Sequence, residues 1–191
     1  MAPRSKARMV AEAGLIAAVY GSATLLTIQV LNVFAFGPLQ LRISEVFTVV
    51  ALFTPAAVPG LFLGSVVANA ALAVGNPLAW LDVVFGSIGT LLGAIWTWRF
   101  RRTKAVALAG PVVFNALIVA AYLPIVLQGL GGRALLDMYR VPVLGWDLSR
   151  SWIAMYAFGV VSVGIGQAIV VYGLGWPLAS AIVRSGVTRE R

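Results

Sequence analysis

The feature that most limits how this chain can fold is a series of apolar stretches of about 20 residues, which recur along its whole length. One such stretch, as a helix, crosses a hydrocarbon core about 30 Å thick. Hydrophobic residues make up 61% of the sequence and charged residues 10%, whereas soluble domains are nearer half apolar and a quarter charged. The sequence therefore predicts an all-α, polytopic membrane protein that forms one domain over residues 1–191.

Six transmembrane helices are expected. Their approximate bounds are 9–33, 43–54, 58–74, 78–98, 105–128 and 151–183. The second segment is short for a full crossing, but the distribution of charge supports it. Most of the 14 Lys and Arg residues lie in the N-terminal tail (about 1–8), the "RFRRTK" loop at 99–104 and the C-terminal tail (about 184–191). With six crossings, all three basic segments fall on the cytoplasmic side, as the positive-inside rule predicts.

The same residues exclude several other functions. The net charge of +8 follows the topology and forms no extended basic face, so we expect no nucleic-acid partner. The chain has no Cys and no His, which removes disulfides, thiol chemistry and His-based metal or acid–base sites. It has no G-x-x-x-x-G-K-[ST] loop for ATP hydrolysis. We therefore expect no catalytic residue, no metal and no cofactor.

Charged and amide side chains at membrane depth are the candidate functional residues, because such groups are costly in lipid. The stretch "FGPLQLRISEVFT" places Arg42 and Glu45 three residues apart. The two side chains either pair with each other at the membrane interface, or Glu45 binds a ligand. Asp82 has no basic neighbour in the sequence, which favours a functional role.

Amide side chains are expected near these acids. A tight turn joins the third and fourth segments, so Asn69 and Asp82 should reach similar depths in the outer half of the membrane. Asn115 and Gln167 fall near the middle of the last two segments. Each amide is either a ligand contact or an interhelical hydrogen-bonding group, and Gln167 fits the second role better.

Aromatic residues mark the predicted outer boundary. Trp80, Trp146 and Trp152 lie there, where an aromatic belt is expected in any membrane protein. One of them, with Trp80 as the candidate, would alternatively stack on a flat ligand.

Small residues repeat along the first segment. Ala13, Ala17 and Gly21 recur at every fourth position, and Gly14, Ala18 and Ser22 lie beside them. A smooth helical face of this kind lets another helix approach closely. The face serves either packing within the chain or docking of a partner protein.

The segments "FGPLQLRISEVFTVVALFTPAAVPGLFLGSVVANAAL", "WLDVVFGSIGTLLGA" and "GPVVFNALIVA" resemble the queuosine-precursor transporter (QueT) family. Its members are substrate-binding S components of energy-coupling factor (ECF) transporters. The resemblance runs from about residue 10 to residue 183. Its most specific part is R-I-S-E followed by W-L-D-V-V-F-G.

The resemblance implies a six-helix S component in the bacterial plasma membrane, which works with a transmembrane coupling protein and two cytoplasmic ATPases. Ala13, Ala17 and Gly21 would contact the coupling protein. The implied ligands are 7-deazaguanines: 7-aminomethyl-7-deazaguanine, queuine or the nucleoside queuosine. Glu45 and Asp82 would accept from the guanine-like edge and from the cationic amine, in either order, while the Asn amides read the carbonyl and ring nitrogens. Arg42 would hold Glu45 in place or cap the site.

Three other interpretations remain open. An S component of the same class would bind a different flat, vitamin-like heterocycle. A self-sufficient secondary transporter would need no ATPase partner. A membrane enzyme is disfavoured, because one Asp–Glu pair would be its only acid–base equipment.

Overall fold

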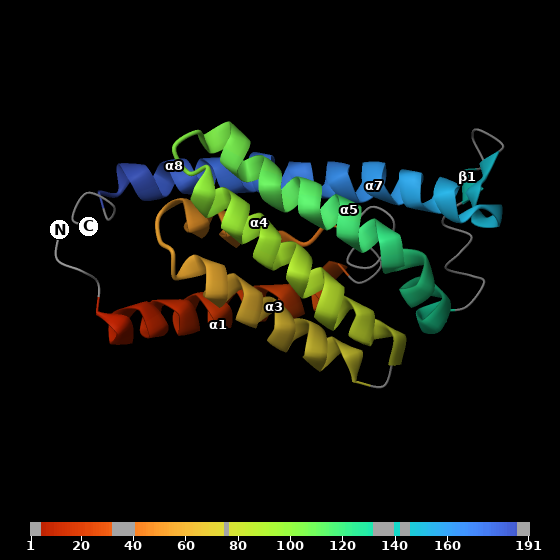
Figure 1. The fold of residues 1–191 in the computed structure, drawn as a ribbon, viewed down its shortest axis with the longest axis horizontal. Coiled ribbons are helices and arrows are strands. Elements are labelled where there is room, and N and C mark those ends of the chain that lie inside the picture. The colour runs from red at the N-terminus through yellow and green to blue at the C-terminus, as the bar shows by residue number, and fades with distance from the viewer. Residues whose placement is uncertain (1–4, 32–40, 75–76, 132–139, 142–145, 187–191) are drawn as a thin grey trace.

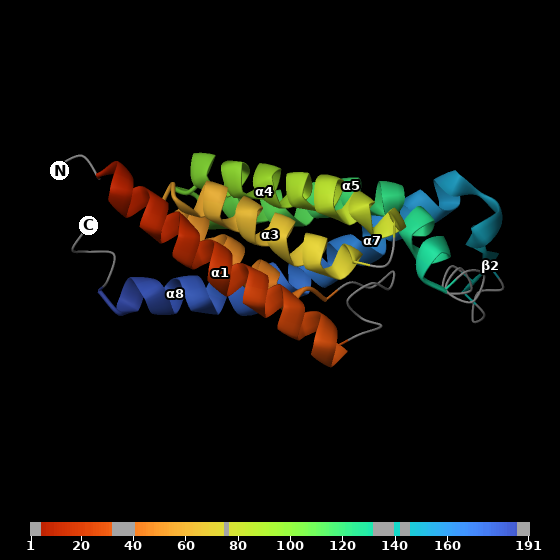
Figure 2. The same cartoon turned by 90° about the horizontal axis from the view of Figure 1, so that it is seen from below.

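The apolar stretches of the sequence form helices that run roughly along the long axis of the molecule (Figure 1, Figure 2). The computed structural model describes residues 5–31, 41–74, 77–131, 140–141 and 146–186. The helical elements are α1 (Lys6–Leu31), η1 (Ile43–Leu52), α3 (Ala57–Ala73), η2 (Pro77–Ala79), η3 (Asp82–Gly86), α4 (Ser87–Arg99), α5 (Lys104–Gly131), η6 (Leu148–Arg150), α7 (Trp152–Ala168), η7 (Ile169–Gly175) and α8 (Trp176–Arg184). The strands β1 (Arg140–Val141) and β2 (Trp146–Asp147) form one short antiparallel pair between α5 and α7.

The predicted all-α class is confirmed. Within the described part of the chain, three helical stretches are long and apolar enough to cross a membrane: Lys6–Thr27, Lys104–Ile125 and Trp152–Arg184. Ile43–Leu52 and Ala57–Ala73 are shorter apolar helices. The number of crossings stays a prediction. The turn expected at 75–77 falls largely on residues outside the described ranges.

The short second segment forms a tight 3₁₀ helix, η1, in the middle of the bundle. A 3₁₀ helix rises about 2.0 Å per residue against about 1.5 Å for an α-helix, so these ten residues extend about 20 Å rather than about 15 Å. The element contacts α1, α3, α4, α5, η7 and α8. Because helices surround it, six of its ten residues are buried, Glu45 among them, whereas Ile43 at its start is 42% exposed.

Two long helices contain π-helical turns. The turn η3 lies within one helical run from Trp80 to Arg99, and η7 lies between α7 and α8. Turns of this kind are rare and often occur at functional sites. The first of them places Asp82 in the protein interior.

The bundle is held by adjacent helix pairs. The pairs α1–α3, α4–α5 and α5–α7 make the most extensive contacts. One apolar cluster joins Tyr20 of α1 to Leu61 of α3 and Ala94 of α4. Another joins Val119 and Leu123 of α5 to residues of α7. The two clusters include Tyr20 and Tyr122, whose hydroxyls bond to the buried acids described below.

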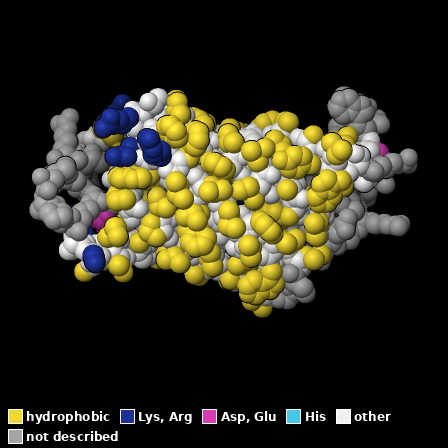
Figure 3. All heavy atoms as spheres, in the orientation of Figure 1, with side chains coloured by type: hydrophobic (Ala, Val, Ile, Leu, Met, Phe, Trp, Pro, Cys, Tyr) yellow, Lys and Arg dark blue, Asp and Glu magenta, His cyan; other side chains and the backbone are white. Residues whose placement is uncertain are grey.

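Apolar side chains cover the body of the molecule, and basic side chains gather at one end (Figure 3). The start of α1, the α4–α5 connection and the end of α8 lie at that same end (Figure 1). The predicted arrangement, with the basic segments on one side of the membrane, is consistent with this fold. Which side that end faces stays a prediction.

Candidate ligand-binding site

Buried polar side chains gather in the interior of the bundle. Burying such groups is costly unless each finds a hydrogen-bond partner. Several of them have none within the described residues: Arg42 Nε, Ser44 Oγ, Glu45 Oε2, Asn115 Nδ2, Asn115 Oδ1 and Gln167 Oε1. A polar ligand in this region would meet donors and acceptors that the described residues leave unused.

Glu45 is the most deeply buried acid and is only half satisfied. It lies in the first turn of η1 and is fully buried. The hydroxyl of Tyr20 on α1 donates to Glu45 Oε1 over 2.6 Å. Glu45 Oε2 has no hydrogen-bond partner among the described residues. Tyr20 thus holds one carboxylate oxygen in place, and the other oxygen can accept a further hydrogen bond.

Asn115 of α5 lies beside this carboxylate, together with Thr90 of α4. Asn115 is buried, and neither the oxygen nor the nitrogen of its amide makes a hydrogen bond to a residue that the structure describes. Gly89 makes room for it, because a Cβ atom on Gly89 would lie 2.9 Å from Asn115 Oδ1. The Glu45 carboxylate and the Asn115 amide therefore occupy one region of the core.

Arg42 pairs with Asp82 instead of Glu45. Its Nη2 atom donates to Asp82 Oδ1 over 2.9 Å and to Oδ2 over 2.7 Å. The hydroxyl of Tyr122 also donates to Asp82 Oδ1. The alternative of a simple Arg42–Glu45 pair is therefore wrong. Arg42 precedes the first residue of η1 and has an extended backbone, so the helical i,i+3 geometry does not apply to it.

Asp82 thus gains in space the basic neighbour that it lacks in sequence. Its two carboxylate oxygens accept from a guanidinium and a phenol, and both partners are buried. Because the Arg42 charge lies against it, the Asp82 carboxylate is compensated within the protein.

Asn69 joins α3 to the π-helical turn η3. Its amide nitrogen donates to the Asp82 carbonyl over 3.0 Å and lies 3.3 Å from Ser65 Oγ and 3.4 Å from Ser87 Oγ. Ser87 Oγ also donates to Ser65 Oγ. In this arrangement Asn69 serves as an interhelical hydrogen-bonding group, one of the two roles expected for it.

The aromatic candidates lie near the surface. Trp80 is 54% exposed and Trp152 is 47% exposed, unlike the buried cluster around Glu45. The side chain of Trp146 lies outside the described part. A role for Trp80 in stacking on a ligand stays a prediction. The buried amide of Gln167, on α7, has an unpartnered Oε1 atom, so the structure shows no interhelical hydrogen bond through that oxygen.

Sequence reasoning missed two tyrosines that define this region. Tyr20 is the donor to Glu45, and Tyr122 is a donor to Asp82. A signal was present, because a buried Tyr hydroxyl usually finds a hydrogen-bond partner and both residues fall inside apolar segments. Tyr122 also follows Asn115 by seven residues, which places the two on one face of α5.

The small-residue face of α1 is in contact with α3. A Cβ atom on Gly60 would lie 2.8 Å from the carbonyl oxygen of Ala13, and one on Gly64 would lie 2.6 Å from that of Ala17. Gly21 faces Gly64 in the same way. Of the two alternatives, packing within the chain is present. The neighbouring face, made of Gly14, Ala18 and Ser22, is exposed.

Comparison with known proteins places the chain in a family. The family model described as QueT transporter matches residues 10–184, which covers the buried polar cluster and both faces of α1. No curated protein and no solved structure matched the chain. The match agrees with the apolar helical fold and with the resemblance carried by the R-I-S-E and W-L-D-V-V-F-G segments. The chain is a membrane protein that belongs to the QueT transporter family, a family of transporters rather than of enzymes.

Proposed function

We propose that this protein is the substrate-binding S component of an ECF-type importer and that it captures a 7-deazaguanine from outside the cell. The compounds in question are 7-aminomethyl-7-deazaguanine, queuine and queuosine. The observation that carries the proposal is that Glu45 Oε2 and both polar atoms of the Asn115 amide are buried without a hydrogen-bond partner among the described residues. A transporter needs a site that is polar, enclosed and incomplete without its substrate, and these two side chains supply one.

The chemistry of the pair matches a guanine-like edge. That edge presents adjacent N–H and NH₂ donors, which a carboxylate accepts well. The Glu45 carboxylate has a free oxygen, while Tyr20 holds the other in position. The Asn115 amide carries one acceptor and two donors, which suits the carbonyl and a ring nitrogen of the base. Glu45 therefore binds the base edge in our proposal.

Asp82 has a different role in this proposal. Its oxygens already accept from Arg42 and Tyr122, so it does not compete for the base edge. It fixes Arg42 instead, and the Nε atom of Arg42 stays without a partner among the described residues. Arg42 then caps the site with that N–H donor, and Asp82 and Asn69 maintain the wall of the site.

The importer assignment also requires partners. A transmembrane coupling protein and two cytoplasmic ATPases would supply ATP hydrolysis, for which this sequence has no P-loop. The basic end of the bundle faces the cytoplasm in this arrangement, with both termini there and the protein in the bacterial plasma membrane.

Docking to the coupling protein takes place along α1 in this proposal. Ala13, Ala17 and Gly21 remain candidates for this contact. They already pack against α3 in the structure, so the exposed neighbours Gly14 and Ala18 offer the surface that a partner helix reaches first. Small residues on that surface would allow a close approach. Replacing Ala18 with Trp should abolish uptake by cells that contain the complete importer, yet leave ligand affinity of the isolated protein within about twofold.

The ligand assignment is tested by titrating the purified protein. Wild-type protein should bind 7-aminomethyl-7-deazaguanine or queuine and should bind neither guanine nor riboflavin comparably. Glu45→Gln places an NH₂ donor against the ligand's donors. Because an unsatisfied buried polar group costs about 1–3 kcal/mol, and more when charged, affinity should fall at least about tenfold. Asn115→Ala should have a smaller effect, since it removes neutral hydrogen bonds only.

Glu12→Gln is the matched control. Glu12 lies on α1 two turns before Tyr20, about 12 Å along the helix axis, and pairs with Arg8. Its substitution should leave ligand affinity unchanged. Binding of riboflavin alone would reject the ligand class. Wild-type ligand affinity in Glu45→Gln would show that the ligand does not bind at Glu45. Uptake by the protein alone, in vesicles that lack ATP, would favour a secondary transporter.

A further inference from the structure

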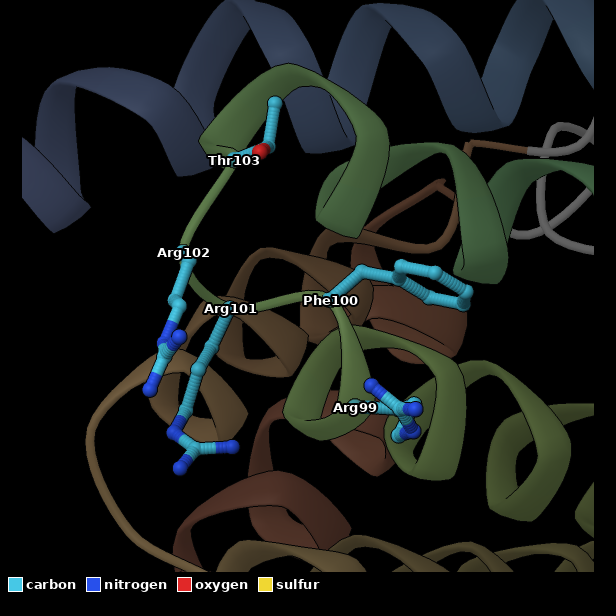
Figure 4. A pocket seen from close by; sticks show the side chains of 5 residues that line it. All are labelled: Arg99, Phe100, Arg101, Arg102 and Thr103. Carbon is cyan, nitrogen blue, oxygen red and sulfur yellow. The ribbon is translucent and has the colours of Figure 1, made fainter.

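The connection between α4 and α5 forms a basic pocket at the end of the bundle. Its lining consists of Arg99, Phe100, Arg101, Arg102 and Thr103. In Figure 4 the side chains of Arg101 and Arg102 extend from the loop in the same direction, and that of Arg99 lies at the last turn of α4. The pocket belongs to the patch of basic side chains that Figure 3 shows at this end. It has no part in the proposed site for the substrate.

No acidic side chain among the described residues pairs with the basic side chains of this pocket. Within the described part of the chain, none of the three arginines forms a salt bridge. The helix α5 begins beside them, at Lys104, and has no acidic residue in its first turn. A helix N-terminus carries about half a positive elementary charge. Guanidinium groups beside a helix N-terminus whose first turn has no acidic residue are well suited to an anion.

The arginines have separate roles. Arg101 Nη1 donates to the carbonyl oxygen of Trp98 over 2.9 Å, and its guanidinium lies 3.9 Å from the centre of the Trp98 ring. Arg101 is therefore held in place at the end of α4. The side chains of Arg99 and Arg102 are exposed and make no hydrogen bond to a described residue, although the Arg99 guanidinium lies 5.7 Å from the centre of the Phe100 ring. These two side chains are available to an external anion.

The surroundings of the pocket indicate which anion it takes. Phe100, in its lining, is 37% exposed, and the apolar side chains of Ile95 and Val106 are exposed on the adjoining turns. Lys104 lies 5.2 Å from the Trp176 ring. Trp and basic residues at the ends of apolar helices are typical of the headgroup region of a bilayer. A soluble anion would gain nothing from this apolar rim, whereas a phospholipid carries its acyl chains alongside its phosphate.

We propose that this pocket binds the phosphate of an anionic phospholipid, with Arg99 and Arg102 donating to the phosphate oxygens and Phe100 lying against the lipid. Arg101 and the N-terminus of α5 add to the local positive potential. The proposal is independent of the substrate, since it concerns other residues at the end of the bundle. We therefore expect the α4–α5 connection to bind anionic phospholipids more tightly than phospholipids without net charge.

Native mass spectrometry of the full chain tests this. Either phosphatidylglycerol or phosphatidylcholine with the same acyl chains is added to the protein in detergent, and the detergent is then removed in the mass spectrometer. Wild-type protein should retain one phosphatidylglycerol at a free lipid concentration about tenfold lower or more than it needs for phosphatidylcholine. The double variant Arg99→Gln/Arg102→Gln should lose that preference. The control Lys6→Gln/Arg184→Gln removes the same charge from the same end and should keep it.

Each other outcome rejects the proposal. If both double variants lose the preference for phosphatidylglycerol equally, the lipid is attracted by the net charge of this end and not by a specific site. An unchanged preference in Arg99→Gln/Arg102→Gln would place the lipid elsewhere. Displacement of the lipid by millimolar glycerol phosphate would identify a site for soluble phosphate. If wild-type protein shows no lipid preference but the arginine variant fails to bind the coupling module, the pocket is a protein docking site. Thermal unfolding of the same samples checks the fold separately.

Discussion

Replacing Asp82 with Asn should lower the thermal stability of the protein, because the structure gives this carboxylate three internal hydrogen bonds. Arg42 Nη2 donates to both of its oxygens and the Tyr122 hydroxyl donates to one. The side chains of Arg42 and Asp82 are only 5% and 9% exposed. Asn has one acceptor oxygen, and its NH₂ group would face a donor from Arg42 or Tyr122. The guanidinium would remain buried without its counter-ion.

The size of the effect follows from that burial. Removing one partner of a buried ion pair costs about 3–5 kcal/mol. For chains of this size, each kcal/mol corresponds to about 2–4 °C in melting temperature. Asp82→Asn should therefore unfold roughly 6–20 °C below wild type. The assay is thermal unfolding of the purified protein in one detergent, followed by far-ultraviolet circular dichroism.

Asp147→Asn is the matched control. Asp147 is exposed and its Oδ1 accepts from the backbone N–H and the hydroxyl of Ser149 at the start of η6, contacts that the Asn oxygen also accepts. Its melting temperature should stay within about 2 °C of wild type. The double variant Arg42→Gln/Asp82→Asn should recover part of the loss, since it leaves no buried unpaired charge. If Asp82→Asn has the melting temperature of wild type but loses deazaguanine binding, the carboxylate faces the ligand and our reasoning is wrong.

Two further changes test the packing around Glu45 and α1. Tyr20→Phe leaves Glu45 Oε1 without its donor, which should cost about 1–3 kcal/mol and lower the melting temperature by roughly 2–12 °C; an unchanged melting temperature would mean that another donor takes over. Gly64→Val should destabilise by about 1–3 kcal/mol, because its Cβ atom would lie 2.6 Å from the Ala17 carbonyl oxygen. Gly14→Val serves as the control, because a Cβ atom on Gly14 would meet no other atom within 4 Å. Equal melting temperatures for the two Val variants would contradict the α1–α3 contact.

The sequence alone was enough for the properties that depend on local hydropathy. The all-α class and the approximate positions of the helices follow from apolar runs that are recognisable without their neighbours. The 42–45 segment could also be selected from the sequence as a candidate site, because an acid in an apolar stretch is unusual wherever it packs; its role stays a prediction. The tight helix η1 was expected only as a short span, since hydropathy does not distinguish 3₁₀ from α-helical winding.

Only the tertiary structure decided the partners. Arg42 and Asp82 are 40 residues apart, as are Asp82 and Tyr122, and Tyr20 is 25 residues from Glu45. No local pattern encodes such pairs, because they depend on how η1, α1, α4 and α5 are rotated about their axes. The face of α1 used for packing was undecided for the same reason. Two adjacent stripes of small residues look alike in sequence, and the position of α3 determines which one is covered.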